Sequence, residues 1–539
     1  MKNSSGQLPS GPAAPANPRV ARVILALACL LVVAVYVAMA DLKGIGTDEG
    51  FRLGIVNGAK EYTASEPATQ ATWSDVLQAN NPYAYQPLYF LILNTVMRVG
   101  HTHDELVLKY VNVFFLWLSL QGLLALSRGW QLTPRLFLVG VFSLNVYLFM
   151  HVLQLREYIV GIAFYVWSSW LVLRLDRRIV VGGWADVGWF SAYGGLLAAG
   201  YFTQSWAVFP AVAQGIFLLR RRAGDRLRFY AYLALSYLIV LSLAWPYLQT
   251  HSQKVNIGRW GVAGTLLWPR LADGFHFVLS GQSFGESSFA DFLFWFWLAL
   301  LAGGAAWWLR DRARGDSTGF RQEASRQAWL MLLSLGVAVA FQIGYFLKVD
   351  TLSVWPRYFA LHYFFVIWLV ALCFNGLWRR ATDRTLPARA QRAWRVVASV
   401  VLAMTIGASG FQIRSYYLDP YLDSGLTETF SWRLLSAGLS HVIQPGDTVL
   451  TQDFLHAWTL SFTRPLVNPI LPIQKTPTGP NPGVKRFVYL ETTGNVSARN
   501  EAVARLGALG FSRVHAEKLR LADTADTIRG WNVLIFERP

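Results

Sequence analysis

Cysteine is scarce in this chain, and charged residues are few for its length. Only Cys29 and Cys373 occur among 539 residues, and both lie in apolar stretches, which excludes a disulfide framework, a Cys-x-x-Cys redox pair and a cysteine zinc site. Charged residues make up 15% of the chain and hydrophobic residues 54%, which leaves too few charges for a water-soluble surface. The composition therefore predicts an integral membrane protein.

Acidic residues are the scarcer charge: 31 Asp and Glu against 48 Lys and Arg give a net charge of +17. In a soluble protein this excess favours a nucleic-acid partner. Here the basic residues fall in short gaps between apolar runs, a distribution that orients membrane proteins. No glycine-rich phosphate loop or dinucleotide fingerprint is present. We therefore expect neither a nucleic-acid partner nor a nucleotide site.

Apolar runs predict about eleven transmembrane helices between residues 19 and 412, after a Gly, Pro, Ser and Ala-rich tail at 1–18 that is expected to be disordered. The run 87–99 is too short to span and is expected to form a helix along the outer surface. The predicted spans lie at 20–40, 106–127, 136–150, 159–174, 186–200, 206–219, 229–248, 288–309, 328–347, 358–377 and 396–412.

Arginine clusters in alternate gaps, such as 174–178, 220–228 and 379–395, are predicted to face the cytoplasm. The N-terminus is then cytoplasmic, residues 41–105 form the first outer loop, and 413–539 lie outside. The predicted location is a bacterial inner membrane, with the C-terminus in the periplasm.

The segment 413–539 has a soluble-like composition and predicts a small exoplasmic α/β domain. Strands are expected at 448–451, 486–491 and 531–536, and helical pieces at 454–462 and 498–509.

Asp48 and Glu49 are adjacent carboxylates just beyond the first span. Two such groups near a bilayer repel each other and lose water, which favours the protonated form of one and suits it to act as a general base. The pair also fits a helix N-terminus capped by Thr47 or Asp48. The two interpretations are compatible, because a cap fixes a base in place.

The segment Tyr83 to Phe90 (Tyr-Ala-Tyr-Gln-Pro-Leu-Tyr-Phe) is aromatic, and interfacial tyrosines alone indicate a membrane belt. Together with the acidic pair, however, it resembles the GT-C glycosyltransferases, in particular the family related to protein O-mannosyltransferases and the lipid A aminoarabinose transferase. It is similar to that family's His-Pro-Pro-Leu-Tyr-Tyr motif. The similar segments, which fall within residues 20–376, also include Leu155 to Tyr158 (Leu-Arg-Glu-Tyr), Tyr201 to Trp206 (Tyr-Phe-Thr-Gln-Ser-Trp) and Trp355 to Tyr358 (Trp-Pro-Arg-Tyr).

Two positions depart from the family pattern: Gln86 stands where His or Pro is usual, and Gln204 where His is common. Neither amide titrates, so neither is expected to serve as acid or base. Both remain candidates for the substrate groove. The other groove candidates are Tyr85, Tyr89, His251 and Tyr358.

The resemblance implies transfer of a sugar from a polyprenyl-phosphate carrier to a glycan, lipid or protein acceptor on the exoplasmic face, with no metal or other cofactor. It favours Asp48 as the base and Glu49 as its partner.

The leaving phosphate needs cations, and Arg357 is the first choice because its forked guanidinium matches phosphate oxygens and its predicted outer position defies the charge rule. A snorkelling helix-end arginine is the alternative. Lys348 and Arg156 are second choices, with Glu157 expected to pair with Arg156.

Histidines are weaker candidates. The segment His101 to Glu105 matches no structural zinc spacing and is expected to form a turn between two helices. His151, His251 and His276 are placed in outer loops, as proton carriers or interfacial residues. The aromatic-rich segment 249–287 is either a lid over the site or an interfacial belt.

Two other functions compete with glycosyl transfer. A flippase or transporter of a lipid-linked saccharide needs ionisable residues in mid-span and an alternating-access repeat. Most apolar runs lack such charges, and no paired, broken short spans are present. A receptor with a partner-binding outer domain needs far fewer spans as an anchor.

Overall fold

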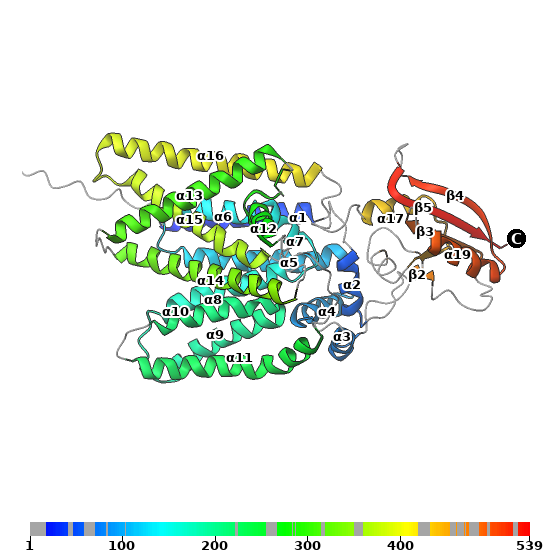
Figure 1. Ribbon diagram of the computed structural model, residues 1–539, viewed down its shortest axis with the longest axis horizontal. Coiled ribbons are helices and arrows are strands. Elements are labelled where there is room, and N and C mark those ends of the chain that lie inside the picture. The colour runs from blue at the N-terminus through cyan, green and yellow to red at the C-terminus, as the bar shows by residue number, and fades with distance from the viewer. Residues whose placement is uncertain are drawn as a thin grey trace, which may run out of the picture.

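A bundle of helices and a small α/β domain beyond one end of it make up the described chain (Figure 1). The computed structural model describes residues 18–40, 47–58, 71–81, 85–102, 104–220, 225–254, 267–282, 284–285, 287–313, 319–349, 359–418, 432–452, 460, 468, 470–473, 484–492, 496–520 and 527–538. The helices before the C-terminal domain are α1 (Pro18–Met39), α2 (Thr47–Val56), α3 (Trp73–Asn80), α4 (Leu88–Gly100), α5 (Glu105–Leu126), α6 (Leu132–Ser143), α7 (Val146–Leu153), α8 (Tyr158–Leu175), α9 (Trp184–Thr203), the 3-10 turn η1 (Ser205–Ala207), α10 (Val208–Leu219), α11 (Arg226–Lys254), α12 (Leu267–Ser280), α13 (Ser288–Ala313), α14 (Gly319–Val349), α15 (Ala360–Thr382) and α16 (Ala388–Leu418).

Eight helices among the described residues are long and apolar enough to cross a membrane, namely α1, α5, α8, α11, α13, α14, α15 and α16. Helices α6 and α7 reach that length together but meet at a bend of 60°. The predicted spans at 186–200 and 206–219 coincide with α9, whose apolar content is diluted by glycine and polar aromatics, and with α10, which has 12 residues. The polytopic helical fold is confirmed, and the count of eleven spans stays a prediction.

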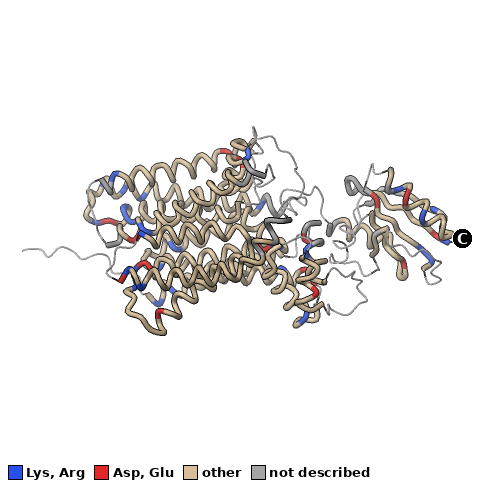
Figure 2. The backbone as a smooth tube through the Cα atoms, turned by 60° about the horizontal axis from the view of Figure 1, so that its bottom comes forward, with Lys and Arg blue, Asp and Glu red and all other residues tan. Residues whose placement is uncertain are grey.

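The basic loops of the bundle share one end, which lies away from the C-terminal domain (Figure 2). The α8–α9, α10–α11 and α15–α16 connections all reach this end, as the alternation of charged gaps requires. Helices α2, α3 and α4 lie at the opposite end (Figure 1). Which end faces the cytoplasm stays a prediction.

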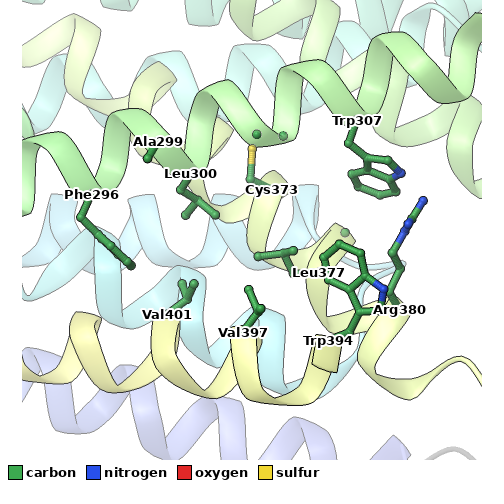
Figure 3. Close-up of a pocket in the computed structure, with 13 residues that line it drawn as sticks. Phe296, Ala299, Leu300, Trp307, Cys373, Leu377, Arg380, Trp394, Val397 and Val401 are labelled. Carbon is green, nitrogen blue, oxygen red and sulfur yellow. The ribbon is translucent and has the colours of Figure 1, made fainter. Parts of the chain in front are cut away.

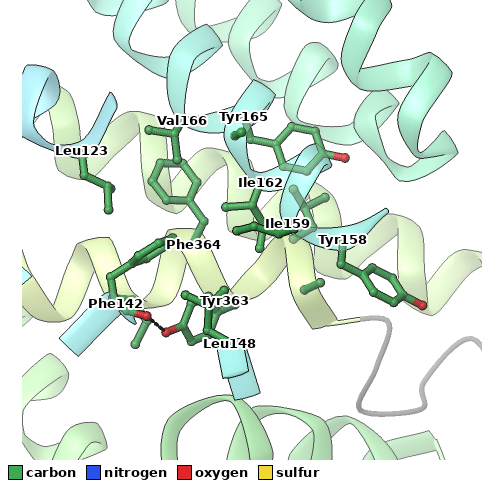
Figure 4. Packing of buried hydrophobic residues seen from close by; sticks show 14 of the residues in the cluster. Leu123, Phe142, Leu148, Tyr158, Ile159, Ile162, Tyr165, Val166, Tyr363 and Phe364 are labelled. Carbon is green, nitrogen blue, oxygen red and sulfur yellow. Dashed lines mark hydrogen bonds between the residues drawn. The ribbon is translucent and has the colours of Figure 1, made fainter. Parts of the chain in front are cut away.

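Helices α8 and α15 form the centre of the bundle. The apolar window is 78% buried in α8 and 83% buried in α15, whereas in the peripheral α13 it is 17% buried. Both central helices are apolar around their whole circumference, as a fully packed helix requires. Figure 4 shows Ile162 and Val166 of α8 beside Phe364 of α15. The turn at 154–157, which precedes α8, therefore has a rigid support.

Side chains from distant helices form hydrogen bonds with backbone groups at the break between α6 and α7. The Tyr363 hydroxyl donates to the carbonyl of Phe142 (Figure 4). The Gln412 side chain accepts from the Val146 N–H at 3.0 Å and donates to the carbonyl of Ser280 at 2.7 Å. Backbone groups that a bend releases at membrane depth need such partners. The bend is thus a specified feature, and it positions α7 and the turn that follows.

The C-terminal domain is a five-stranded mixed sheet of order β2-β1-β3-β5-β4. Strand β1 is parallel to β2 and β3, and β5 is antiparallel to β3 and β4. Leu435 of α17 joins the apolar cluster on one face, and Leu506 of α19 joins the other. The elements are β1 (Thr448–Thr451), β2 (Ile470–Pro472), β3 (Arg486–Thr492), β4 (Ser512–Arg520), β5 (Thr527–Glu537), α17 (Trp432–Ser440) and α19 (Val496–Ala508).

Three of these strands, β1, β3 and β5, and helix α19 coincide with elements predicted from the sequence. The piece expected at 454–462 lies outside the described residues except for residue 460, and so does the tail at 1–17. The sequence did not predict β2, β4 or α17, and α16 continues to Leu418, beyond the expected boundary at 412. Strand β4 is a polar edge strand that lacks the hydrophobic alternation of a half-buried strand.

Candidate functional site

Helix α2, directly after the first span, is held on the turn between α7 and α8 by two ion pairs. Glu49 Oε1 lies 3.7 Å from Arg156 Nε, and both side chains are buried. Arg52, one helical turn further along α2, pairs with Glu157. Residues three apart share a helix face, so both pairs leave the same side of α2. The expected pairing of Arg156 with Glu157 was wrong, because the adjacent positions each take a partner from α2.

Asn112 of α5 holds the same turn from another side. Its Nδ2 donates to the carbonyls of Gln154 at 2.5 Å and Arg156 at 3.3 Å, and its Oδ1 accepts from the Tyr89 hydroxyl at 3.1 Å. Burial raises the pKa of Tyr89, so this hydroxyl stays a neutral donor. One amide therefore links α4, α5 and the turn before α8. Sequence reasoning missed Asn112, although an amide inside the apolar run 106–127 was a signal for it.

Tyr85 lies beside α2 and is partly exposed. The Arg52 guanidinium lies over its ring at 5.5 Å from the centroid, and the ring meets Phe90 edge-on at 6.0 Å. Its side chain is 37% exposed, whereas Tyr89 is fully buried. Gln86, the residue after Tyr85, is half-buried. The structure thus brings Tyr85, Gln86 and Tyr89 beside α2, and their contact with substrate stays a prediction.

Gln204 lies where α9 ends, packed against α8. Its Oε1 accepts from the Tyr165 hydroxyl at 3.3 Å, and a Cβ on Gly161 would come within 2.9 Å of that oxygen. Gly161 is one turn along α8 from Glu157, so Gln204 approaches the same end of α8 as α2 does. Its amide joins the end of α9 to α8.

Five predicted residues have side chains outside the described part of the chain. Asp48 lies in the first turn of α2, Lys348 near the end of α14 and His251 near the end of α11, and in each case only the backbone is described. Arg357 and Tyr358 fall within residues 350–358, which are not described. The roles assigned to these residues stay predictions.

Two histidines that were expected in loops lie in helices and are buried. His151 is buried within α7, between the rings of Tyr147 and Tyr158 at centroid distances of 4.4 and 4.5 Å. His276 is buried within α12, with Nε2 at 3.0 Å from an oxygen of Asp291. Aromatic packing, which the loop assignment overlooked, draws both rings inward.

The turn expected at 101–105 is confirmed, since α4 ends at Gly100 and α5 begins at Glu105. Asp104 caps α5 by accepting from the Leu106 N–H at 2.9 Å. Across the described residues, no three His, Cys, Asp or Glu side chains are grouped to hold a metal ion, and His103 lies outside those residues. Independence from metal stays a prediction.

The aromatic-rich segment 249–287 is partly helical. Helix α11 continues to Lys254, and α12 occupies Leu267–Ser280. Phe277 is buried, whereas Trp268 is 68% exposed. Residues 255–266 lie outside the described part, so the choice between a lid and a belt stays open.

The arrangement of helices resembles solved membrane glycosyltransferases. ArnT from Cupriavidus metallidurans in the apo state aligns with a TM-score of 0.52 and 12% identity, covering 96% of this chain and 98% of that chain. The same protein bound to undecaprenyl phosphate aligns with a TM-score of 0.50, 12% identity and the same coverage. Arabinofuranosyltransferase AftD from Mycobacteria gives a TM-score of 0.49 and 12% identity over 97% of this chain and 40% of that chain. No protein-family model and no curated protein matches the sequence.

The fold is the GT-C fold. This confirms the fold that the sequence resemblance implies. In this GT-C bundle the acidic pair begins α2, and α2 is fixed to the turn that carries the Leu-Arg-Glu-Tyr motif.

Proposed function

We propose that this protein transfers a sugar from a polyprenyl-phosphate donor to an acceptor at the exoplasmic membrane surface. The observation that carries the proposal is the fixed position of α2, with its adjacent carboxylates, at one end of a GT-C bundle. The ArnT structure, which shares the fold and was solved with undecaprenyl phosphate, supports a lipid-phosphate ligand. The tail of such a donor lies in the bilayer while its sugar reaches the water interface.

In the proposed reaction Asp48 accepts the proton of an acceptor hydroxyl. The acceptor oxygen then attacks the anomeric carbon of the sugar, and the bond from that carbon to the phosphate oxygen breaks. Polyprenyl phosphate leaves with the electron pair, and cations stabilise the charge that develops on it. The first proposed cation is Arg357, followed by Lys348.

The ion pairs suggest different roles for Asp48 and Glu49. Glu49 is already engaged with Arg156 in a buried contact, so it acts as a positioning residue that fixes the first turn of α2. Arg156 has the matching role on the turn before α8, and its pairing with Glu49 makes it less suited than Arg357 or Lys348 to hold the donor phosphate. Asp48, the preceding residue of α2, is then held in place by its neighbour, which suits a base that must meet a lipid-borne substrate.

A reconstituted assay tests this function. The full chain is placed in liposomes with an organic-solvent extract of its host's membranes, which supplies polyprenyl-phosphate sugars and lipid acceptors, and soluble envelope glycans are added. We expect free polyprenyl phosphate to form only when the protein is present. Formation of sugar-bearing product at the same rate in protein-free liposomes, or no release from any extract, contradicts the proposal.

A further inference from the structure

A second feature lies at the arginine-rich end of the bundle, far from α2. A crevice of about 320 Å³ runs between α13 and α16, with α15 as its floor (Figure 3). Carbon atoms form nearly all of its wall, from Phe296 near mid-bundle to Trp307 at the basic end. We propose that this crevice binds one acyl chain of an anionic phospholipid from the leaflet at that end.

Its length matches a single leaflet. Phe296 and Trp307 are eleven residues apart on α13, which at 1.5 Å per residue is about 16 Å. Half of a typical hydrocarbon core is about 15 Å. The crevice also opens sideways, since Gly303 is exposed and Val397 on α16 is 42% exposed. Because α13 and α16 are peripheral spans, that opening faces lipid rather than another helix.

Three glycines on α13 and α15 shape the crevice. A Cβ at Gly304 would lie 2.2 Å from the Cys373 sulfur, so this glycine lets α13 approach α15 closely. A Cβ at Gly376 would lie 2.2 Å from Trp307, which allows the indole to rest on α15. At Gly303, by contrast, an added Cβ meets nothing within 4 Å, so this position faces open space. The helices are therefore tightly packed at Gly304 and Gly376, whereas the space beside Gly303 is open.

Arg380, at the basic end of the crevice, supplies a positive charge that favours an anionic headgroup. The Arg380 guanidinium lies close to two indoles, 4.6 Å from the centroid of the Trp307 ring and 5.2 Å from that of the Trp394 ring (Figure 3). Contact with both rings holds the guanidinium beside the end of the crevice. The surrounding loops are basic, and a basic pocket between transmembrane helices is suited to an anionic headgroup. Trp307 and Trp394 have the amphipathic character typical of residues at headgroup depth.

The test counts lipids retained by the purified full chain. The protein is exchanged into detergent with phosphatidylglycerol, phosphatidylcholine or undecaprenyl phosphate, and bound lipid is measured by native mass spectrometry. We expect one phosphatidylglycerol per chain to be retained about fivefold more strongly than phosphatidylcholine, the preference that one arginine confers. Gly303→Leu fills the crevice and should remove this lipid, while Arg380→Gln should abolish the preference and leave the apolar contact.

Two matched controls separate the site from general effects. Gly336→Leu adds the same side chain to an exposed position of α14 where a Cβ also meets nothing within 4 Å, and it should retain the lipid. Arg384→Gln removes an exposed charge just beyond α15 and should keep the preference. Equal retention by Gly303→Leu and wild type, equal retention of both phospholipids by wild type, or loss of undecaprenyl phosphate instead of phosphatidylglycerol in Gly303→Leu overturns the proposal. None of these outcomes depends on the proposed glycosyl transfer.

Discussion

The Glu49 carboxylate lies 3.7 Å from the Arg156 guanidinium, and the two side chains are 0% and 2% exposed. A buried charge is tolerated only when another charge compensates for the loss of water. This pair therefore joins the segment after the first span to the turn before α8. It also fixes the backbone that carries Asp48.

Removing one member of this pair should destabilise the protein strongly. Glu49→Gln or Arg156→Met removes this ion pair and leaves the other charge buried, at a cost of about 3–5 kcal/mol. Thermal unfolding in detergent should show a clear loss of Tm for each single variant. The double variant should recover most of that loss, since neither charge remains. Losses that simply add in the double variant would show that the two residues do not depend on each other.

Replacing Asn112 should reduce stability and activity more than replacing its partner Tyr89. Tyr89→Phe removes one hydrogen bond, a loss of about 1 kcal/mol. Asn112→Leu removes that bond and also the bonds from the amide to the carbonyls of Gln154 and Arg156, each worth about 1 kcal/mol, although the Gln154 carbonyl keeps the Arg156 N–H at 2.9 Å. The rate of polyprenyl phosphate release and the Tm should therefore both fall further in Asn112→Leu. Equal effects in the two variants would show that the amide does not hold the turn.

Gln412 should stabilise the bend between α6 and α7. Gln412→Leu removes two hydrogen bonds to backbone groups, one to the Val146 N–H at the bend and one to the Ser280 carbonyl at the end of α12, so we expect a loss of about 2–4 kcal/mol. Gln391→Leu, at the start of the same helix, removes only a 3.4 Å contact and serves as the control. Unfolding in detergent compares the two, and equal stability would contradict the account of the bend.

The sequence was sufficient for features set by local composition. Long apolar runs predicted the helices, and short apolar segments predicted β1, β3 and β5, because burial determines both patterns. The sequence could not predict which residues form ion pairs. Glu157 pairs with Arg52 rather than with its neighbour Arg156, because the pairing depends on how α2 packs against the turn. The edge strand β4 was missed because its stability comes from pairing with β5, and its own residues are polar.

Topology can be tested with reporters fused at the two ends of α16. A periplasm-dependent phosphatase after residue 418 should be active, while the same reporter in the α15–α16 loop after residue 385 should be silent, because the arginine-rich loops are predicted to be cytoplasmic. Activity in the opposite pair would reverse every loop assignment.

The most direct measurement is release of polyprenyl phosphate by Asp48→Asn in the reconstituted assay. Loss of a general base typically slows a reaction by about 100-fold or more, so we expect a drop of at least that size with unchanged Tm. Asp104→Asn is the matched control, because asparagine caps a helix as well as aspartate does and should keep both activity and the α5 cap. If Asp48→Asn releases polyprenyl phosphate at the wild-type rate, the carboxylate is not the base and the central claim is wrong.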